Sequence, residues 1–389
     1  MSDRYIGVGD FYPSPEAIFA VMDVLKSRRI SYGPYSKKFE QEFAKLHQRQ
    51  FGVLSNSGTS SLLVALQTLK ELGGWNDGDE VIVPAITFVA TVNVILHCNL
   101  TPVLVDIEKD FYCIDCTLIE QAITPKTKAI IPVHMFGQPA DMCYVNAIAQ
   151  HHNLKVIEDS CEAMFVKHRD KPVGAWGDIA CFSTYVAHLI TTGVGGVAIT
   201  DNPEYAEVMR SLVNHGRDNI YISIDDSKGD RVKEVIGKRF SFERVGHSFR
   251  ITELEAALGL AQLEDYHFIL DPRQQWSFWY DNGLSEYKEY LQLPKIREDS
   301  EHAWMMYPII CKQLGLRDMI VQHLESWGIE TRRMMPITNQ PVYAGMFNED
   351  NYPVAKWINE GGFYIGIHQY LTNEDVEYVI EKFGEFEWD

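Results

Sequence analysis

Residues 129–159 read AIIPVHMFGQPADMCYVNAIAQHHNLKVIED, and this stretch decides the fold class. Its apolar start predicts a buried strand over 129–133, and the spacing of apolar residues over 141–151 predicts a helix. A second short strand is expected over 155–157, ending in the two carboxylates Glu158 and Asp159. A strand, a crossover helix and another strand of these lengths are typical of a parallel sheet covered by helices.

The same alternation continues toward the N-terminus. Helices are expected over 60–72, 88–97 and 117–122, and strands over 80–84 and 102–105. The sequence therefore predicts an α/β fold with a mostly parallel central sheet. In such sheets ligands bind beyond the carboxyl ends of the strands.

Three polar residues follow expected strands and are candidates for that rim: Asp106, His134 and Asp159. The alternative for each is an ordinary polar residue that caps a loop. A strong amphipathic helix is expected over 253–266, with Leu254, Ala257, Leu258, Ala261 and Leu263 on one side.

The pattern changes after about residue 250. Few strand–helix units follow, which predicts a smaller α+β domain at the C-terminal end. We expect a large domain over 1–248 and a small domain over 249–389. The charge-rich stretch over 221–238 is expected to be a long surface loop.

Composition limits the function classes. The 389 residues carry a formal net charge of -19, which argues against non-specific binding of nucleic acid. No signal peptide and no apolar stretch of about 20 residues is visible, so we expect a soluble, cytoplasmic protein without a membrane partner. The pair Cys113 and Cys116 forms one CxxC without a second, and no metal site is expected.

Small residues at an expected helix start suggest an anion site. The run 55–60 reads SNSGTS, and Gly58 and Thr59 stand at the helix start, where free backbone N–H groups favour phosphate. The alternative is a simple helix cap. Asp159, at a strand end, could pair with the protonated nitrogen of a pyridoxal ring, and Phe88 could stack on that ring; the alternative for Phe88 is a core aromatic.

Nine motifs follow one another along the chain. They read SGT, P-x-x-TF-x-AT, DI, H-x-x-GQPAD, EDSCEA, FS-x-x-x-x-H-x-x-TTG-x-GG, NHGR, G-x-S-x-R-x-TELEAALGLAQL and IETR. Together they resemble the DegT/DnrJ/EryC1/StrS family of sugar aminotransferases and dehydratases, from about Ser31 to Phe383. The resemblance implies the aspartate-aminotransferase-like fold type I and the cofactor pyridoxal phosphate.

The resemblance also implies roles for single residues. Gly58, Thr59 and Ser183 match the phosphate site, Phe88 matches the aromatic stacked on the ring, and Asp159 matches the partner of the ring nitrogen.

Two further matches lie in the motif that contains GHSFR. Arg250 lies in the segment that, in the family, reaches across a homodimer to the other subunit's site. Ser248 stands where an asparagine is expected near the phosphate.

Besides Ser248, three residues depart from the aminotransferase pattern. His188 stands where the family has the lysine that binds the cofactor, Val194 replaces a glutamate, and Glu162 stands where aminotransferases often carry glutamine. Imidazole forms no stable imine but moves protons near neutral pH. In this family, histidine at that position resembles the sugar 3-dehydratases.

The resemblance therefore predicts a 3-dehydratase of a nucleotide-linked 4-keto-6-deoxy sugar. Pyridoxal phosphate or pyridoxamine phosphate would be bound without a covalent link, His188 and Glu162 would be catalytic, and glutamate would be the amino donor. Two alternatives stay open: an aminotransferase homologue that lacks the lysine, natural or mutated, and a degenerate or regulatory family member.

Overall fold

The computed structural model describes residues 4–217 and 240–388. The surface loop expected over 221–238 lies outside these residues. Within the described part, no helix combines the length and the apolar character needed to cross a membrane.

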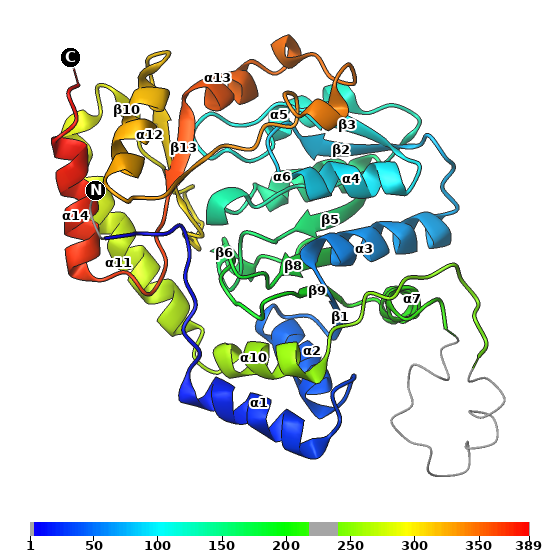
Figure 1. Ribbon diagram of the computed structural model, residues 1–389. Coiled ribbons are helices and arrows are strands. Elements are labelled where there is room, and N and C mark those ends of the chain that lie inside the picture. Colours follow the sequence, from blue (N-terminus) through cyan, green and yellow to red (C-terminus); the bar gives the residue numbers. More distant parts are fainter. Residues whose placement is uncertain (1–3, 218–239, 389) are drawn as a thin grey trace.

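A seven-stranded sheet forms the centre of the molecule (Figure 1). Its strands, in spatial order, are β1 (Phe51–Ser55), β9 (Gly196–Thr200), β8 (Ile179–Ser183), β5 (Lys155–Asp159), β4 (Thr127–Ile130), β2 (Glu80–Pro84) and β3 (Thr101–Val105). The five from β8 to β3 are parallel to their neighbours, whereas β9 pairs antiparallel with both β1 and β8. The predicted mostly parallel sheet is confirmed.

Helices cover this sheet and bury its apolar faces (Figure 1). They are α3 (Gly58–Gly73), α4 (Val89–His97), α5 (Cys116–Ile119) with the 3-10 turn Glu120–Ala122, α6 (Met142–His151) and α7 (Pro203–Val213). Crossovers between parallel strands place the helices on the two faces of the sheet. The carboxyl ends of the strands thus stay free to build a site.

Three further helices pack together beside the β1–β9 edge. They are α1 (Pro15–Ser27), α2 (Pro34–Leu46) and α10 (Glu253–Leu263), and α10 lies against both α1 and α2 (Figure 1).

The buried face of α10 differs from the expected one. Leu254, Leu258 and Ala261 are only half-buried, whereas Gly259 and Leu260 are buried. A Cβ on Gly259 would lie 2.6 Å from the Phe39 ring, so the missing side chain lets α10 approach α2 closely. This close approach, which apolar spacing does not reveal, sets the rotation of the helix.

The C-terminal part contains a second, antiparallel sheet in the order β10 (Leu291–Gln292), β11 (Tyr307–Cys311), β13 (Gly362–Ile365) and β12 (Thr331–Arg333). Its helices are α11 (His267–Gly283), α12 (Leu316–Ser326), α13 (Pro353–Gly361) and α14 (Asn373–Gly384). Most of these elements share a core of their own. A division of the chain at residue 248 stays a prediction.

The remaining elements are short. They are β6 (Lys167–His168), β7 (Lys171–Pro172) and the 3-10 turns Met135–Gly137, Ser285–Tyr287, Pro341–Tyr343 and Glu349–Asn351.

Some expected bounds were wrong. β4 covers Thr127–Ile130 instead of 129–133, because Pro132 has no N–H to donate to the ladder. β5 runs on to Asp159.

Candidate functional site

A cavity of about 420 Å³ opens where β5 and β8 end and α3 begins. Its walls come from the β1–α3 junction, the start of α4, the segment after β5, the β8–β9 loop and the C-terminal part. Seven of the nine predicted site residues line it: Gly58, Thr59, Phe88, Asp159, Glu162, Ser183 and His188. The site is therefore on the rim that the parallel sheet predicts.

The N-terminus of α3 forms one end of the cavity. The Ser57 hydroxyl accepts a hydrogen bond from the N–H of Ser60 at 3.0 Å, which leaves Gly58 and Thr59 at the exposed end of the helix dipole. A Cβ at Gly58 would lie 2.7 Å from Cβ of Ser183 and 2.8 Å from Sγ of Cys161. Only glycine thus lets the helix start come this close to β8.

Asp159 closes the end of β5 and is almost fully buried. One carboxylate oxygen accepts a hydrogen bond from the Thr91 hydroxyl at 2.8 Å, and the other accepts the N–H of Cys161 at 3.3 Å. Burial raises the pKa of this carboxyl, although these hydrogen bonds oppose the shift. A cationic group in the cavity would favour the ionised form.

Glu162 lies one turn further along and is also buried. Its carboxylate accepts the backbone N–H of Phe136 at 2.7 Å. Burial raises the pKa of Glu162 to about 7, and the nearby Asp159 charge adds to the shift. Glu162 is therefore not a solvated loop carboxylate, which was the other interpretation open for this residue from the sequence.

His188 projects from the loop that joins β8 to β9. Its ring is partly buried, and Nδ1 has no hydrogen-bond partner among the described residues. Burial lowers the pKa of His188 to about 4, so the ring is neutral at pH 7.

The base of this loop is closed. Thr184 and Thr192 share a hydroxyl–hydroxyl hydrogen bond of 2.6 Å, and the N–H of Thr192 donates to the carbonyl of Thr184 at 2.8 Å. The sheet therefore fixes where His188 stands.

The remaining wall is apolar. Phe88 is 55% exposed at the N-terminus of α4, which leaves its ring face open to the cavity. Among the lining residues that the sequence did not predict are Met305, Met306, Met335 and Tyr364. They come from the C-terminal part, and no local pattern marks them.

Two predicted site residues lie outside the cavity. Arg250 is exposed, and its guanidinium donates to the Asn214 side chain at 3.0 Å and to the Ser248 hydroxyl at 3.2 Å. Its other partner is Nε2 of His215 at 3.0 Å. Within one chain, Ser248 and Arg250 thus do not reach the phosphate end.

Two rim candidates have structural roles instead. The Asp106 carboxylate accepts the N–H groups of Val354 and Ala355, both at 2.9 Å, and so caps α13. His134 is fully buried against Glu158, with Nε2 3.2 Å from the carboxylate. Both residues follow strands, but their side chains turn away from the cavity because buried partners hold them.

The fold and the cavity together define a fold type I α/β protein of the aspartate-aminotransferase type. The DegT/DnrJ/EryC1/StrS aminotransferase family matches residues 14–384. The chain belongs to this family, which confirms the motif-based resemblance.

Known relatives agree with this assignment. GDP-perosamine synthase of Caulobacter vibrioides is 34% identical over 90% of this chain and 89% of its own length. Spr1654 of Streptococcus pneumoniae, a proposed sugar aminotransferase solved in its PMP form, is 28% identical with a TM-score of 0.88 and covers 98% of each chain. Escherichia coli GDP-4-keto-6-deoxy-D-mannose-3-dehydratase with bound hydrated PLP superposes with a TM-score of 0.87 at 24% identity, over 98% of this chain and 100% of that one, and shares the fold.

Proposed function

We propose that this protein is a cytoplasmic 3-dehydratase that removes the C3 hydroxyl of a nucleotide-linked 4-keto-6-deoxy sugar. One observation carries the proposal. His188 lines a cavity where none of the described lining residues is a lysine, and its Nδ1 is buried without a hydrogen-bond partner. Family membership supports pyridoxal phosphate or pyridoxamine phosphate as the cofactor.

The residues fit this cofactor held without a covalent link. The start of α3 and the Ser183 hydroxyl suit a phosphate, the exposed Phe88 ring suits a stacked heterocycle, and Asp159 suits a protonated ring nitrogen. The His188 ring lines the same cavity and, with its Nδ1 left unpartnered, is the imidazole available to the reacting end.

Bound as the amine, the cofactor supplies a primary amine for a keto group and a ring that accepts electrons. Asp159 holds the ring nitrogen protonated through its carboxylate. Glu162, once ionised, holds the cationic amine by charge. Neutral His188 accepts a proton at its free ring nitrogen and gives it back.

A missing lysine does not prevent this reaction. The sugar loses its C3 hydroxyl and is released as a 3-deoxy-4-keto sugar. The two electrons for this net reduction and the nitrogen released as ammonia would both come from the amine form of the cofactor, which would be left as the aldehyde. Glutamate then restores the amine form.

We also propose that the protein acts as a homodimer with shared sites. None of the described residues lining the cavity is arginine or lysine, so within one chain a phosphate at the start of α3 would lack a charge-assisted hydrogen bond from a cationic side chain. Arg250 is exposed outside its own cavity and can supply that charge to a second copy. On α1, Ile18, Phe19 and Met22 are exposed apolar side chains of the kind that a partner covers.

Mass spectrometry of the product tests the reaction. The protein is incubated with the cofactor, glutamate and a panel of nucleotide-linked 4-keto sugars. The expected product has lost one oxygen atom and carries no new nitrogen. Absence of turnover on the whole panel would contradict the proposal.

A second candidate is a lysine-free aminotransferase. The relative from Caulobacter vibrioides, named GDP-perosamine synthase, favours it. The same experiment separates the two, because an aminotransferase leaves nitrogen in a 4-amino sugar. Borohydride reduction of the loaded protein adds a check: a cofactor–lysine adduct in the peptides would show that another lysine binds the cofactor.

A further inference from the structure

A group of three metal-ligating side chains lies outside the cavity. Asp141 caps the N-terminus of α6, Cys143 stands in the first turn of that helix, and His168 ends β6. One donor atom from each lies within 4.8 Å of the other two. The three residues thus come from two segments, the start of α6 and the end of β6, and the proposed sugar chemistry uses none of them.

The His168 ring is held with one nitrogen aimed at this group. The side chain is 2% exposed, and Nδ1 lies 2.8 Å from the Ser300 hydroxyl. Nε2 lies 3.4 Å from Oδ1 of Asp141, yet it makes no hydrogen bond. A second partner that orients the ring through its other nitrogen is the usual arrangement for a metal-binding histidine.

The donors match one class of ion. A carboxylate oxygen, a thiolate sulfur and an imidazole nitrogen suit zinc and similar borderline cations, whereas magnesium and calcium prefer oxygen alone. Cys143 is a free, half-buried thiol that can ionise on metal binding.

We propose that Asp141, Cys143 and His168 bind one zinc ion or a similar borderline divalent cation. With three protein ligands, the fourth position of a tetrahedral ion is left for water.

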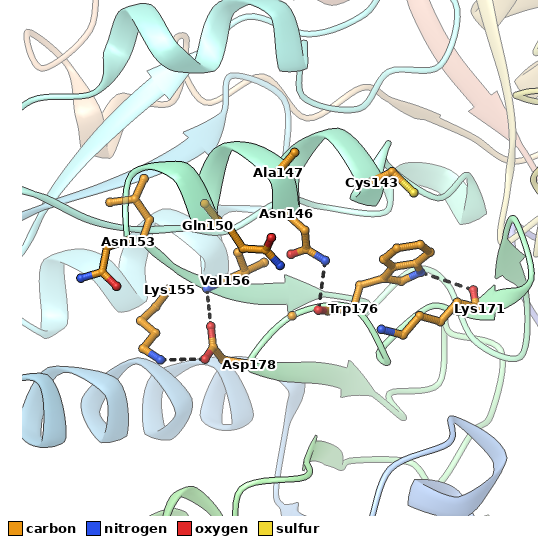
Figure 2. Close-up of a pocket in the computed structure, with 13 residues that line it drawn as sticks. Cys143, Asn146, Ala147, Gln150, Asn153, Lys155, Val156, Lys171, Trp176 and Asp178 are labelled. Carbon is orange, nitrogen blue, oxygen red and sulfur yellow. Dashed lines mark hydrogen bonds and ion pairs between the residues drawn. The ribbon is translucent and has the colours of Figure 1, made fainter.

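An open groove gives access to this place. Figure 2 shows Cys143 at one end of the groove, near Trp176 and Lys171. The Trp176 ring packs against His168 with 5.6 Å between centroids. An ion can therefore reach Cys143 from solvent without opening the core.

The bound ion would tie the start of α6 to the β6–β7 hairpin. The ordinary alternative is that Asp141 only caps the helix, through the N–H of Tyr144 at 3.1 Å, and that Cys143 has no role in binding an ion.

Titration of the cofactor-loaded protein with cobalt separates the two interpretations. Thiolate–cobalt charge-transfer absorption and intense visible bands report sulfur ligation and tetrahedral geometry. Zinc is then added to displace cobalt, and thermal melting with and without zinc gives a second readout.

The variants are Cys143→Ser and Asp141→Asn, because asparagine also caps helices and keeps the fold. Cys98→Ser, a buried thiol at the end of α4, is the matched control. We expect one cobalt per chain in the parent and the control, with a zinc-dependent rise in melting temperature. Loss of a residue that only hydrogen-bonds to a metal ligand costs roughly 10- to 100-fold in metal affinity, so both variants, which lose a ligand, should bind cobalt at least that much more weakly. Cys143→Ser should also show no charge-transfer band. No such band in the parent, or the same band in Cys143→Ser, would overturn the proposal.

Discussion

The hydroxyl of Thr91 donates a hydrogen bond to Asp159 at 2.8 Å, inside the wall of the cavity. Thr91 lies on α4 and Asp159 ends β5, so the bond fixes the carboxylate from a neighbouring layer. It also offsets part of the burial that raises the pKa of Asp159. The Asp159 carboxylate is thus held in position to pair with a cationic group in the cavity, such as a protonated ring nitrogen.

Asp159→Asn should weaken binding of the cofactor. Asparagine keeps the shape but loses the charge that would hold a protonated ring nitrogen. A charge-assisted hydrogen bond contributes about 1.5–3 kcal/mol, so affinity should fall by roughly 10- to 100-fold. Absorbance titration with the cofactor measures it, and Thr91→Ser, which keeps a hydroxyl, is the control. Equal affinity in parent and Asp159→Asn would contradict the role of Asp159.

His188→Asn should abolish proton transfer while the cofactor still binds. Loss of a general base costs roughly 10²–10⁴-fold in rate. Turnover of the 4-keto sugar and cofactor affinity are measured side by side. Unchanged turnover would exclude His188 as the acid–base group.

Glu162→Gln should remove the pH dependence of cofactor retention near neutrality. The pKa of Glu162 is about 7, so its negative charge appears as the pH rises through that value. Retention of the amine cofactor in the parent should therefore improve from about pH 6 to about pH 8. In Glu162→Gln it should be weaker and independent of pH. Dialysis at each pH measures the fraction of amine cofactor that is retained. If the parent and Glu162→Gln retain the same fraction at every pH, Glu162 does not hold the cofactor.

Acid stability should depend on His188. The folded protein holds the pKa of His188 at about 4, below the ordinary 6.5, because burial disfavours the charged ring. Between these two values the unfolded chain binds more protons, so stability falls as the pH drops from about 6.5 to about 4. The loss in the free energy of unfolding is on the order of 1–3 kcal/mol. It stays below the full value of the pKa shift because the ring is only partly buried and solvent in the cavity screens its charge. His188→Asn should lose less stability than the parent in urea unfolding over this range, and an equal loss in both would contradict the shift.

Gly58→Ala should damage both packing and the phosphate end. The added methyl would lie 2.7 Å from Cβ of Ser183, and β8 cannot move without disturbing the sheet. Overpacking of this kind costs roughly 1–3 kcal/mol. Gly74→Ala at the C-cap of α3 is the comparison: its φ of 61° makes alanine strain the backbone, but nothing lies within 4 Å of the added carbon, so it tests glycine loss without overpacking and away from the site. If Gly58→Ala binds the cofactor with the same affinity as the parent, the close approach of the α3 start to β8 is not needed for binding the phosphate.

The sequence predicted much of this architecture. The alternation around 129–159 indicated the parallel sheet because a buried strand and a crossover helix leave strong local periodicities. The antiparallel insertion of β9 was not predicted, since the direction of a strand depends on its tertiary partners.

The site was predicted less evenly. Gly58, Asp159 and His188 stand in ordered motifs, and the structure brings them to one cavity. Asp106 and His134 also follow strands, but buried partners hold them elsewhere. Neither their spacing nor their chemistry distinguishes them from Asp159. The three cavity methionines come from distant loops, so only folding reveals them.

The closed base of the β8–β9 loop has a consequence for how chemistry can change in this scaffold. Ser183 and Gly196 pair across the two strands, and Thr184 bonds to Thr192 just above them. The loop thus has a base that the sheet holds, and the His188 side chain projects from it into the cavity wall. A new residue at position 188 inherits a placed backbone without any refolding. A single substitution at this position can therefore exchange a side chain that moves protons for one that binds covalently, while the fold around it stays the same.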